Sequence, residues 1–180
     1  MKKKIALIFG ISGQDGAYLA NFLLKKKYFV IGITRNNSNQ NLLKLKKINI
    51  KKKLLIYKNK KVTRFFLEKV LNQSKKINEI YYLSGETSPL KSIDKPIDTI
   101  DSNVLSIIKI LEFIRVKSNK TKFFYASSSE IFEKNKKNVF DENSKFGPRT
   151  PYGISKATGQ WFVRFYRQHY NLFCCSGILF

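Results

Sequence analysis

A tyrosine and a lysine stand four residues apart in the segment PYGISK, at Tyr152 and Lys156. On a helix this spacing places both side chains on one face. An ammonium beside a phenol stabilises the phenolate, and so lowers the tyrosine pKa from about 10 toward neutrality, where the phenol can act as a base. The same spacing also arises by chance as a surface contact, so the meaning of the pair depends on the rest of the chain.

Hydroxyls and a carboxylate are grouped upstream in YASSSEIF, residues 125–132. There an apolar, strand-like run passes directly into three serines and Glu130. Glu130 is the only carboxylate of this loop before Glu133, and a carboxylate can act as a base and an acid in turn. We expect Glu130 to take part in chemistry, and Ser127 and Ser129 to be loop residues that satisfy backbone groups.

A glycine-rich loop, GISGQDG, follows the first apolar run at residues 10–16. Glycines at the start of a helix allow a tight turn, and they let backbone N–H groups approach a pyrophosphate at the positive end of the helix. A tight strand-to-helix turn without a ligand is the alternative, but the position in the first strand–helix unit favours a dinucleotide. The loop residues expected to contact this cofactor are Gly10, Ser12, Gly13, Gln14, Asp15 and Gly16.

The elements that must position these residues alternate between strand and helix patterns. Short runs rich in β-branched and aromatic residues predict strands at 4–10, 28–35, 53–57, 79–85, 121–127 and 172–180. Apolar residues at helical spacing predict helices at 17–27, 62–74, 103–115 and from about Pro151 onward. Strands that alternate with crossover helices pair in parallel, so we predict an α/β, Rossmann-like, doubly wound sheet in one domain over residues 1–180. Ligands bind beyond the carboxyl ends of such strands, which is where these loops fall.

Two further loops would complete a dinucleotide site. A carboxylate after the second strand would hold the ribose hydroxyls of NAD, but this chain has Arg35 there and no acidic residue nearby. An arginine suits a 2′-phosphate, so NADP is preferred over NAD; a lone surface arginine in a lysine-rich protein is the alternative. The small, polar loop YLSGETS after the fourth strand can run backbone past a cofactor. Its residues expected to contact the cofactor are Leu83, Ser84, Gly85 and Thr87.

The net charge of +23 over 180 residues is compatible with binding to nucleic acid or an anionic membrane surface. Nearly all the basic residues are lysines spread over most segments, whereas specific phosphate and base recognition favours arginine. We therefore expect solvated basic faces and no specific nucleic-acid partner. The densest basic stretch, Lys44–Lys61, is expected to be a surface connection.

The chain has no run of about 18 apolar residues, and its first apolar run ends after five residues in a glycine turn. We expect a cytoplasmic protein without a membrane span. Cys174 and Cys175 are adjacent, so a disulfide between them would be strained, and two buried, reduced thiols fit a reducing compartment. We expect no metal site.

Together these segments resemble the extended short-chain dehydrogenase/reductase family and, within it, the GDP-mannose 4,6-dehydratases. The resemblance rests on GISGQDGAYLANFLL, GITR, YASSSEIF, PRTPYGISKA and YNLFCCSGILF, and it extends from the first strand to Phe180. Two features of this subfamily distinguish it from the sugar-nucleotide epimerases. They are the SGQDG form of the glycine loop and a glutamate two residues after the catalytic hydroxyl.

The resemblance implies a redox-neutral dehydration of GDP-mannose to GDP-4-keto-6-deoxy-mannose with tightly held NADP. Tyr152, assisted by Lys156, would take the proton of the sugar O4 hydroxyl, and both would contact the cofactor. Ser128 matches the family's usual threonine and would hydrogen-bond O4. Glu130 would take the C5 proton and protonate the departing C6 hydroxyl, and Asn59 would contact the adenine.

Family members run to about twice this length, so the resemblance implies that a C-terminal substrate domain is missing here and that the full-length family forms homo-oligomers. Two alternatives stay open within the resemblance: an inactive, NADP-binding remnant, or another sugar-nucleotide dehydratase or epimerase. A basic nucleic-acid-associated protein is the third and least favoured hypothesis.

Overall fold

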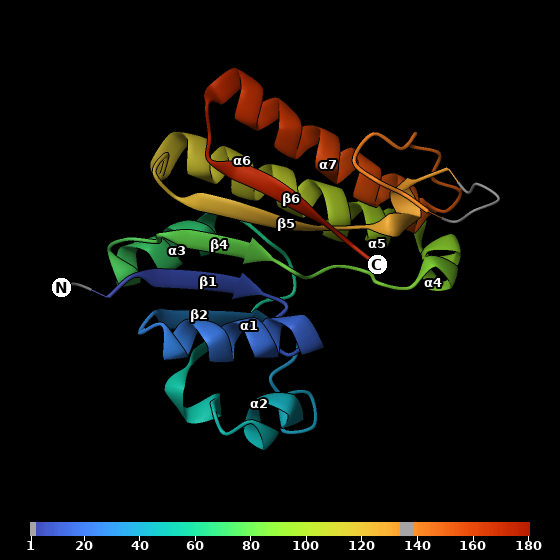
Figure 1. Ribbon diagram of the computed structural model, residues 1–180. Helices are drawn as coiled ribbons and strands as arrows, with labels where there is room; N and C mark the ends of the chain where they lie inside the picture. Colours follow the sequence, from blue (N-terminus) through green and yellow to red (C-terminus); the bar gives the residue numbers. More distant parts are fainter. Residues whose placement is uncertain (1–2, 134–138) are drawn as a thin grey trace.

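Six parallel strands form the sheet of this computed structural model, which describes residues 3–133 and 139–180 (Figure 1). The strands are β1 (Ile5–Phe9), β2 (Phe29–Thr34), β3 (Leu55–Lys58), β4 (Glu79–Tyr82), β5 (Lys122–Ser128) and β6 (Cys174–Leu179). Their order is β3-β2-β1-β4-β5-β6, and every neighbouring pair is parallel. The predicted doubly wound α/β fold is therefore confirmed. The order reverses beside β1, and at such a switch point the loops separate and leave a crevice.

Strand residues alternate between two hydrophobic cores, one on each face of the sheet. Leu7 and Ile31 belong to the core shared with the helices that follow β3, β4 and β5, whereas Ala6 and Ile8 belong to the core shared with the helix after β1. Because both faces of the central strand are covered, β1 is apolar at every position. This buried strand gives the loops at its carboxyl end a rigid support.

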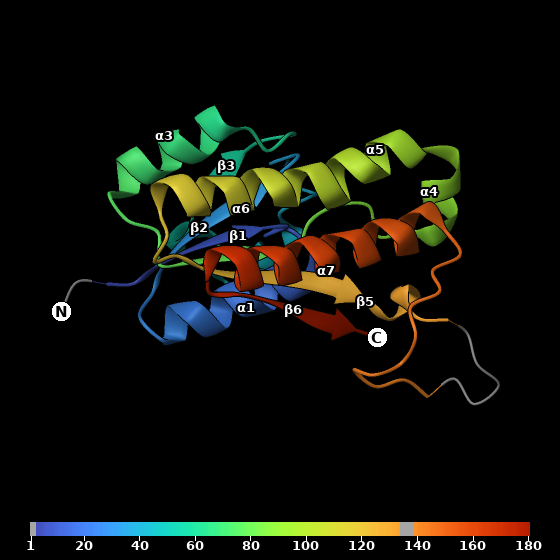
Figure 2. The same ribbon diagram turned by 90° about the horizontal axis from the view of Figure 1, so that it is seen from above.

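Four helices correspond to the predicted helical patterns: α1 (Gln14–Lys25), α3 (Arg64–Ser74), α6 (Ser106–Lys117) and α7 (Pro151–Tyr170). Of these, α3, α6 and α7 pack on one face of the sheet and α1 on the other (Figure 2). Thr150 is the N-cap that fixes the start of α7, because its Oγ1 accepts the N–H of Gly153 at 3.1 Å. Pro151 lies in the first turn of the helix. The helix ends at Asn171, which adopts the left-handed conformation.

The region before α6 has more helical structure than the sequence predicted. Two short helices, α4 (Pro89–Asp94) and α5 (Pro96–Ile100), and a π-helical turn, η2 (Asp101–Leu105), precede α6. Helices of five or six residues contain too few apolar repeats to be found from periodicity, and the prolines in their first turns were the available signal. Single π-helical turns are frequent at functional sites, and η2 contacts the loop that follows β4 through Asn103 and Glu86.

The prediction that Lys44–Lys61 is a surface connection is only partly correct. The segment overlaps α2 (Leu43–Lys47) and contains a 3-10 turn, η1 (Lys51–Lys53), and all of β3. Leu45 and Ile50 are 0% and 3% exposed and belong to the same core as α1. A few apolar side chains anchor the segment, and the many lysines between them concealed this pattern.

The two cysteines are free but lie in different environments. Cys174 is buried, its thiol donates to the carbonyl oxygen of Val163 at 3.3 Å, and burial raises its pKa to about 11. Cys175 is exposed, so the expectation of two buried thiols is wrong for this residue. Successive strand residues face opposite sides of the sheet, and α7 covers the face of β6 to which Cys174 points.

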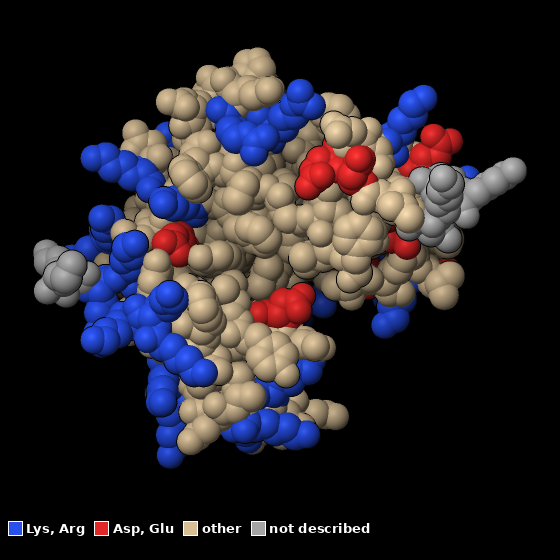
Figure 3. Space-filling model, in the orientation of Figure 1, with Lys and Arg blue, Asp and Glu red and all other residues tan. Residues whose placement is uncertain are grey.

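Basic side chains spread over much of the visible surface, notably around α2 and the end of the molecule near the N-terminus (Figure 3). Acidic side chains are few on this face and lie apart from one another (Figure 3). None of the described helices combines the length and apolar character that crossing a membrane requires.

Candidate functional site

Three adjoining recesses run along the carboxyl ends of the strands. The first recess lies at the ends of β2 and β3, the second lies along the glycine loop, and the third lies where β5 meets the start of α7. Ser84, in the loop that follows β4, lines all three. The loops that the sequence singled out therefore meet in one groove at the switch point of the sheet.

Two glycines of the glycine loop are required by its close packing. Gly10 has a φ of +87°, and a Cβ on it would lie 2.6 Å from the carbonyl oxygen of Leu83. A Cβ on Gly16 would lie 2.2 Å from the carbonyl oxygen of Gly10. Gly13 precedes α1 and provides no side-chain cap, so the first N–H groups of this helix can bind an anion in the second recess.

Four of the six glycine-loop residues predicted to contact a cofactor line the groove: Gly10, Ser12, Gly13 and Asp15. Gly16 is buried, and its place in the loop is explained by its contact with Gly10. Gln14 is exposed at the start of α1 and is not among the residues that line the three recesses.

A hydrogen-bond cluster that the sequence reasoning missed holds the second recess together. The amide nitrogen of Asn41 donates to Thr34 Oγ1 at 3.1 Å and to Ser12 Oγ at 3.3 Å. Thr34 Oγ1 and Ser12 Oγ lie 3.1 Å apart. The asparagine lies in a polar loop with no periodic pattern, so its sequence position gave no signal that it joins β2 to the glycine loop.

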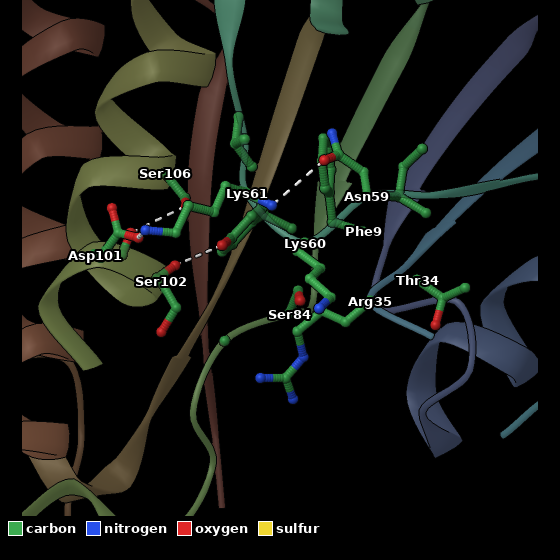
Figure 4. Close-up of a pocket in the computed structure, with 14 residues that line it drawn as sticks. Phe9, Thr34, Arg35, Asn59, Lys60, Lys61, Ser84, Asp101, Ser102 and Ser106 are labelled. Carbon is green, nitrogen blue, oxygen red and sulfur yellow. Dashed lines mark hydrogen bonds and ion pairs between the residues drawn. The ribbon is translucent and has the colours of Figure 1, made fainter. Parts of the chain in front are cut away.

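Arg35 and Asn59 leave the ends of β2 and β3, and both line the first recess (Figure 4). The N–H of Asn59 donates to the carbonyl oxygen of Thr34 at 2.9 Å, which holds the two strand ends together. Arg35 also lines the second recess, and no carboxylate within residues 3–133 and 139–180 forms an ion pair with it. The structure thus brings both predicted residues to one recess and leaves the guanidinium charge unpaired in the described part of the chain.

The loop after β4 is held by Asn103, a residue of η2 that the sequence reasoning did not assign to the site. Asn103 is 0% exposed, its Oδ1 accepts the N–H of Glu86 at 3.0 Å, and its Nδ2 donates to the Glu86 carbonyl oxygen at 3.2 Å. The same Nδ2 donates to Ser155 Oγ on α7 at 3.0 Å. Gly85, with a φ of +122°, brings the loop so close that a Cβ on it would lie 1.9 Å from Asn103 Oδ1. The burial of Asn103 and the π-helical turn that contains it exist only in the folded chain, so the sequence gave no signal for this residue.

The predicted catalytic residues come together in the third recess. Ser128 and Glu130 lie at the end of β5 and in the short 3-10 turn that follows, η3 (Ser129–Ile131), and they line this recess with Tyr152 and Lys156 of α7. The N–H of Glu130 donates to Ser128 Oγ at 3.3 Å. A Cβ on Gly153 would lie 2.5 Å from the carbonyl oxygen of Glu130, so this glycine lets α7 approach the turn. Residues far apart in sequence therefore share one side of the recess.

The lysine of the pair is buried and forms no ion pair with a carboxylate of residues 3–133 and 139–180. Lys156 is 5% exposed, and its Nζ donates to the carbonyl oxygen of Ala126 at 2.8 Å. Nζ also lies 5.2 Å from the ring centre of Tyr125 and 5.7 Å from that of Tyr152. Burial lowers the pKa of Lys156 to about 8.

The pKa of Tyr152 is raised, which is the opposite of the direction that the Tyr–Lys spacing predicts. Burial is the largest cause, and the nearby charges of Glu130 and Glu86 raise it further, whereas the Ser128 hydroxyl acts in the lowering direction. The helical spacing does place the pair on one side of α7, but the Lys156 ammonium is bonded to a backbone carbonyl and not to the phenol.

Ser127 does not have the role that the sequence suggested. Its side chain is 2% exposed, and its Oγ has no hydrogen-bond partner among the described residues. Ser127 lines the third recess beside Lys156, so it satisfies no backbone group and is free to bond a ligand there.

Known proteins match the chain over nearly its whole length. A sequence model of the family described as "GDP-mannose 4,6 dehydratase" matches residues 7–180. The chain is 37% identical over 186 residues to the GDP-mannose 4,6 dehydratase of Cricetulus griseus, an alignment that covers 99% of this chain and 50% of that protein. It is 35% identical over 187 residues to the GDP-mannose 4,6 dehydratase of Drosophila melanogaster, covering 99% of this chain and 47% of that protein. The chain spans about half the length of the curated relatives it matches.

A solved structure supports the fold. The dTDP-glucose 4,6-dehydratase of Bacillus anthracis, in complex with NAD, has a TM-score of 0.82 to this chain at 22% identity. The match covers 97% of this chain and 54% of that one. At this identity the likeness concerns the fold.

Replacing Asn103 by alanine should destabilise the protein and loosen the loop after β4. The change removes the partners of both backbone groups of Glu86, and a buried group that loses its partner costs about 1–3 kcal/mol, so we expect a loss of about 2–4 kcal/mol. Urea unfolding measures the loss, and amide exchange at Glu86 measures the loosening. The matched control is Asn72→Ala, the same change at an exposed asparagine of α3, which should cost less than about 1 kcal/mol; equal costs for both variants would refute the role of Asn103.

The burial of Lys156 should give the protein a distinctive dependence on pH. Its pKa in the folded state, about 8, lies below the usual 10.5, so between these values the unfolded chain binds more protons and stability due to Lys156 rises with pH. We expect the unfolding free energy of the wild type, relative to Lys156→Met, to increase by about 3 kcal/mol between pH 8 and 10.5. Denaturant unfolding at several pH values measures the difference. The same measurement on Lys25→Met, an exposed lysine of α1, should show a flat difference, and a flat difference for Lys156→Met as well would contradict its burial.

Proposed function

The chain belongs to the GDP-mannose 4,6-dehydratase family, and on this premise we propose that it is the dinucleotide-binding part of an enzyme that converts GDP-mannose to GDP-4-keto-6-deoxy-mannose. One observation carries the proposal. Ser128, Glu130, Tyr152 and Lys156 line a single recess that continues into the glycine loop.

The cofactor in this proposal is a nicotinamide dinucleotide, and the residues present fit one. The glycines of the loop let its backbone pack closely against Leu83 and the start of α1, the first N–H groups of α1 lack a side-chain cap, and the buried Oγ of Ser127 lacks a partner among the described residues. NADP is favoured over NAD because Arg35, and no carboxylate, stands at the end of β2. The adenine would lie near Asn59, and the rest of the cofactor would run past Leu83, Ser84, Gly85 and Thr87.

We assign residues 1–180 to one dinucleotide-binding domain. The chain aligns with half of each curated relative, and we propose that the residues that hold the GDP group belong to the other half of the family's length. A cytoplasmic location and assembly into homo-oligomers are part of the same proposal.

In the proposed reaction Tyr152 takes the proton of the sugar hydroxyl at C4, and the Ser128 hydroxyl holds that oxygen in place. A nicotinamide cofactor supplies, when bound, the group that accepts a hydride from the sugar and later returns it. Glu130 takes the proton at C5, which the neighbouring ketone makes acidic, and gives a proton to the hydroxyl that departs from C6 as water. One carboxylate thus acts first as a base and then as an acid, and C5 receives the proton held by Tyr152 when the hydride returns to C6.

Electrostatic coupling in the recess links these roles. The charge of Glu130 raises the pKa of Tyr152, so a protonated Glu130 makes ionisation of the phenol easier. The neutral form of Lys156 becomes accessible near its pKa of about 8, and its charged form is the one that stabilises a phenolate. When Tyr152 acts as a base, the charge of the Lys156 ammonium, 5.7 Å from the centre of the Tyr152 ring, stabilises the phenolate; the ammonium has three N–H donors, so its bond to the carbonyl oxygen of Ala126 can remain.

A second candidate function is dinucleotide binding without turnover. It is favoured by the raised pKa of Tyr152 and by the bond from Lys156 to a backbone carbonyl. In this case the groove would hold NADP, and the third recess would not activate a sugar.

A direct assay separates the two candidates. The purified chain is mixed with GDP-mannose and NADP, and a product lighter by one water and bearing a 4-keto group is sought by mass spectrometry. Formation of this product supports the dehydratase. NADP binding by calorimetry with no product at any enzyme concentration leaves the binding function and refutes turnover by this chain.

Glu130→Gln should reduce formation of the 4-keto product at least about a hundredfold, because an amide can neither take the C5 proton nor deliver one to the leaving hydroxyl. NADP affinity should remain within about twofold of the wild type, since the proposal gives Glu130 no cofactor contact. Glu133→Gln, an exposed neighbour with the same change in charge, is the control and should keep full turnover. Wild-type turnover by Glu130→Gln would remove Glu130 from the mechanism.

A further inference from the structure

The corner formed by the ends of β2 and β3 brings two basic residues to one recess. In the register of these strands Thr34 pairs with Lys58, and the N–H of Asn59 then donates to the Thr34 carbonyl oxygen at 2.9 Å. The residues that follow, Arg35 on one strand and Lys60 on the other, therefore leave the sheet side by side. Both line the first recess, and the close-up shows their side chains next to Ser84 at its mouth (Figure 4).

The basic residues at this corner divide into two pairs by their partners. Asp101 of η2 forms ion pairs with Lys61 at 3.4 Å and with Lys109 at 3.8 Å. Arg35 and Lys60 form no ion pair within the described residues. Of the basic side chains at this corner, Arg35 and Lys60 are therefore the two without an ion pair in the described part of the chain, and the charge of Arg35 interacts only at longer range with Glu86.

The rest of the recess has the character of a site for a small ligand with an apolar ring and a charged group. Its lining includes the apolar side chains of Phe9, Ile33 and Val62 and the hydroxyl-bearing Ser102 and Ser106. A doubly charged phosphate monoester matches two positive charges that form no ion pair in the described part of the chain.

We propose that Lys60 is a specificity-determining residue that, together with Arg35, binds the 2′-phosphate of the cofactor. The inference rests on the proposed function, in which the first recess holds the adenosine end of NADP. The guanidinium of Arg35 can bond two phosphate oxygens, and the ammonium of Lys60 provides the second charge that a dianion requires. The 2′-hydroxyl of NAD carries no charge, so Lys60 adds to the affinity for the phosphorylated form alone.

The test uses two probes that differ only in the phosphate of interest, adenosine 2′,5′-bisphosphate and adenosine 5′-monophosphate. Calorimetric titration of the full chain gives the ratio of their affinities. For Lys60→Met we expect affinity for the bisphosphate to fall about fivefold to tenfold, as for a charge-assisted bond that is partly solvated, with the monophosphate unchanged. Lys60→Arg should keep the ratio, because it restores the charge.

Lys58→Met is the matched control, because Lys58 is an exposed lysine two residues earlier that does not line the recess. It should leave the ratio within about twofold, and an equal loss in both methionine variants would overturn the proposal, since the general positive field of the chain would then explain the binding. A wild-type chain that prefers neither probe overturns this inference and the NADP preference together. A selective loss in Lys60→Met supports the inference even if the dehydratase assay fails, so the two failures are distinguishable.

Discussion

Asn103 joins three segments that lie far apart in the sequence. Its side-chain amide bonds both backbone groups of Glu86 in the loop after β4 and the hydroxyl of Ser155, the residue before Lys156 on α7. That loop lines every recess of the groove, so the position of one buried amide affects the glycine loop, the corner at Arg35 and the third recess at once. A buried polar group with all its partners is rigid, because each alternative arrangement would leave a donor or acceptor unpaired. The irregular π-helical turn at η2 is what directs this side chain toward the loop.

In the third recess, burial shifts the pKa values of Tyr152 and Lys156 so that both charged forms are disfavoured, whereas the Tyr–Lys spacing predicted an ammonium that stabilises a phenolate. Lys156 is buried among apolar and aromatic groups with a backbone carbonyl as its hydrogen-bond partner, and this environment disfavours its charge. The same burial, together with Glu130, disfavours the phenolate of Tyr152. Both members of the pair are therefore held toward their neutral forms. A substrate or cofactor that changes the charge or the water content of the recess would shift the pKa values of both groups, because both line the same recess.

Much of the fold and the outline of the site could be predicted from sequence because they depend on local patterns. Apolar runs and turn glycines gave the six strands, and the alternation of strand and helix gave their parallel order. That order alone places the carboxyl ends of the strands at one edge, so Arg35, Glu130 and Tyr152 were expected to line one groove, as they do. The short helices α4 and α5 and the buried leucine of α2 were missed, since five or six residues give no periodicity to detect.

The tertiary structure alone decided which of these residues have partners. Composition shows an excess of lysines, but only the packing of η2 against the end of β3 gives Lys61 a carboxylate and leaves Lys60 without one in the described part of the chain. Spacing placed Tyr152 and Lys156 on one side of a helix, but the depth of burial set the direction of their pKa values. The sequence by itself determined the residue types, the fold and the edge at which they meet, because these follow from local propensity and chain topology. Desolvation and hydrogen-bond partnership depend on distances between segments remote in sequence, and therefore only the folded chain could decide them.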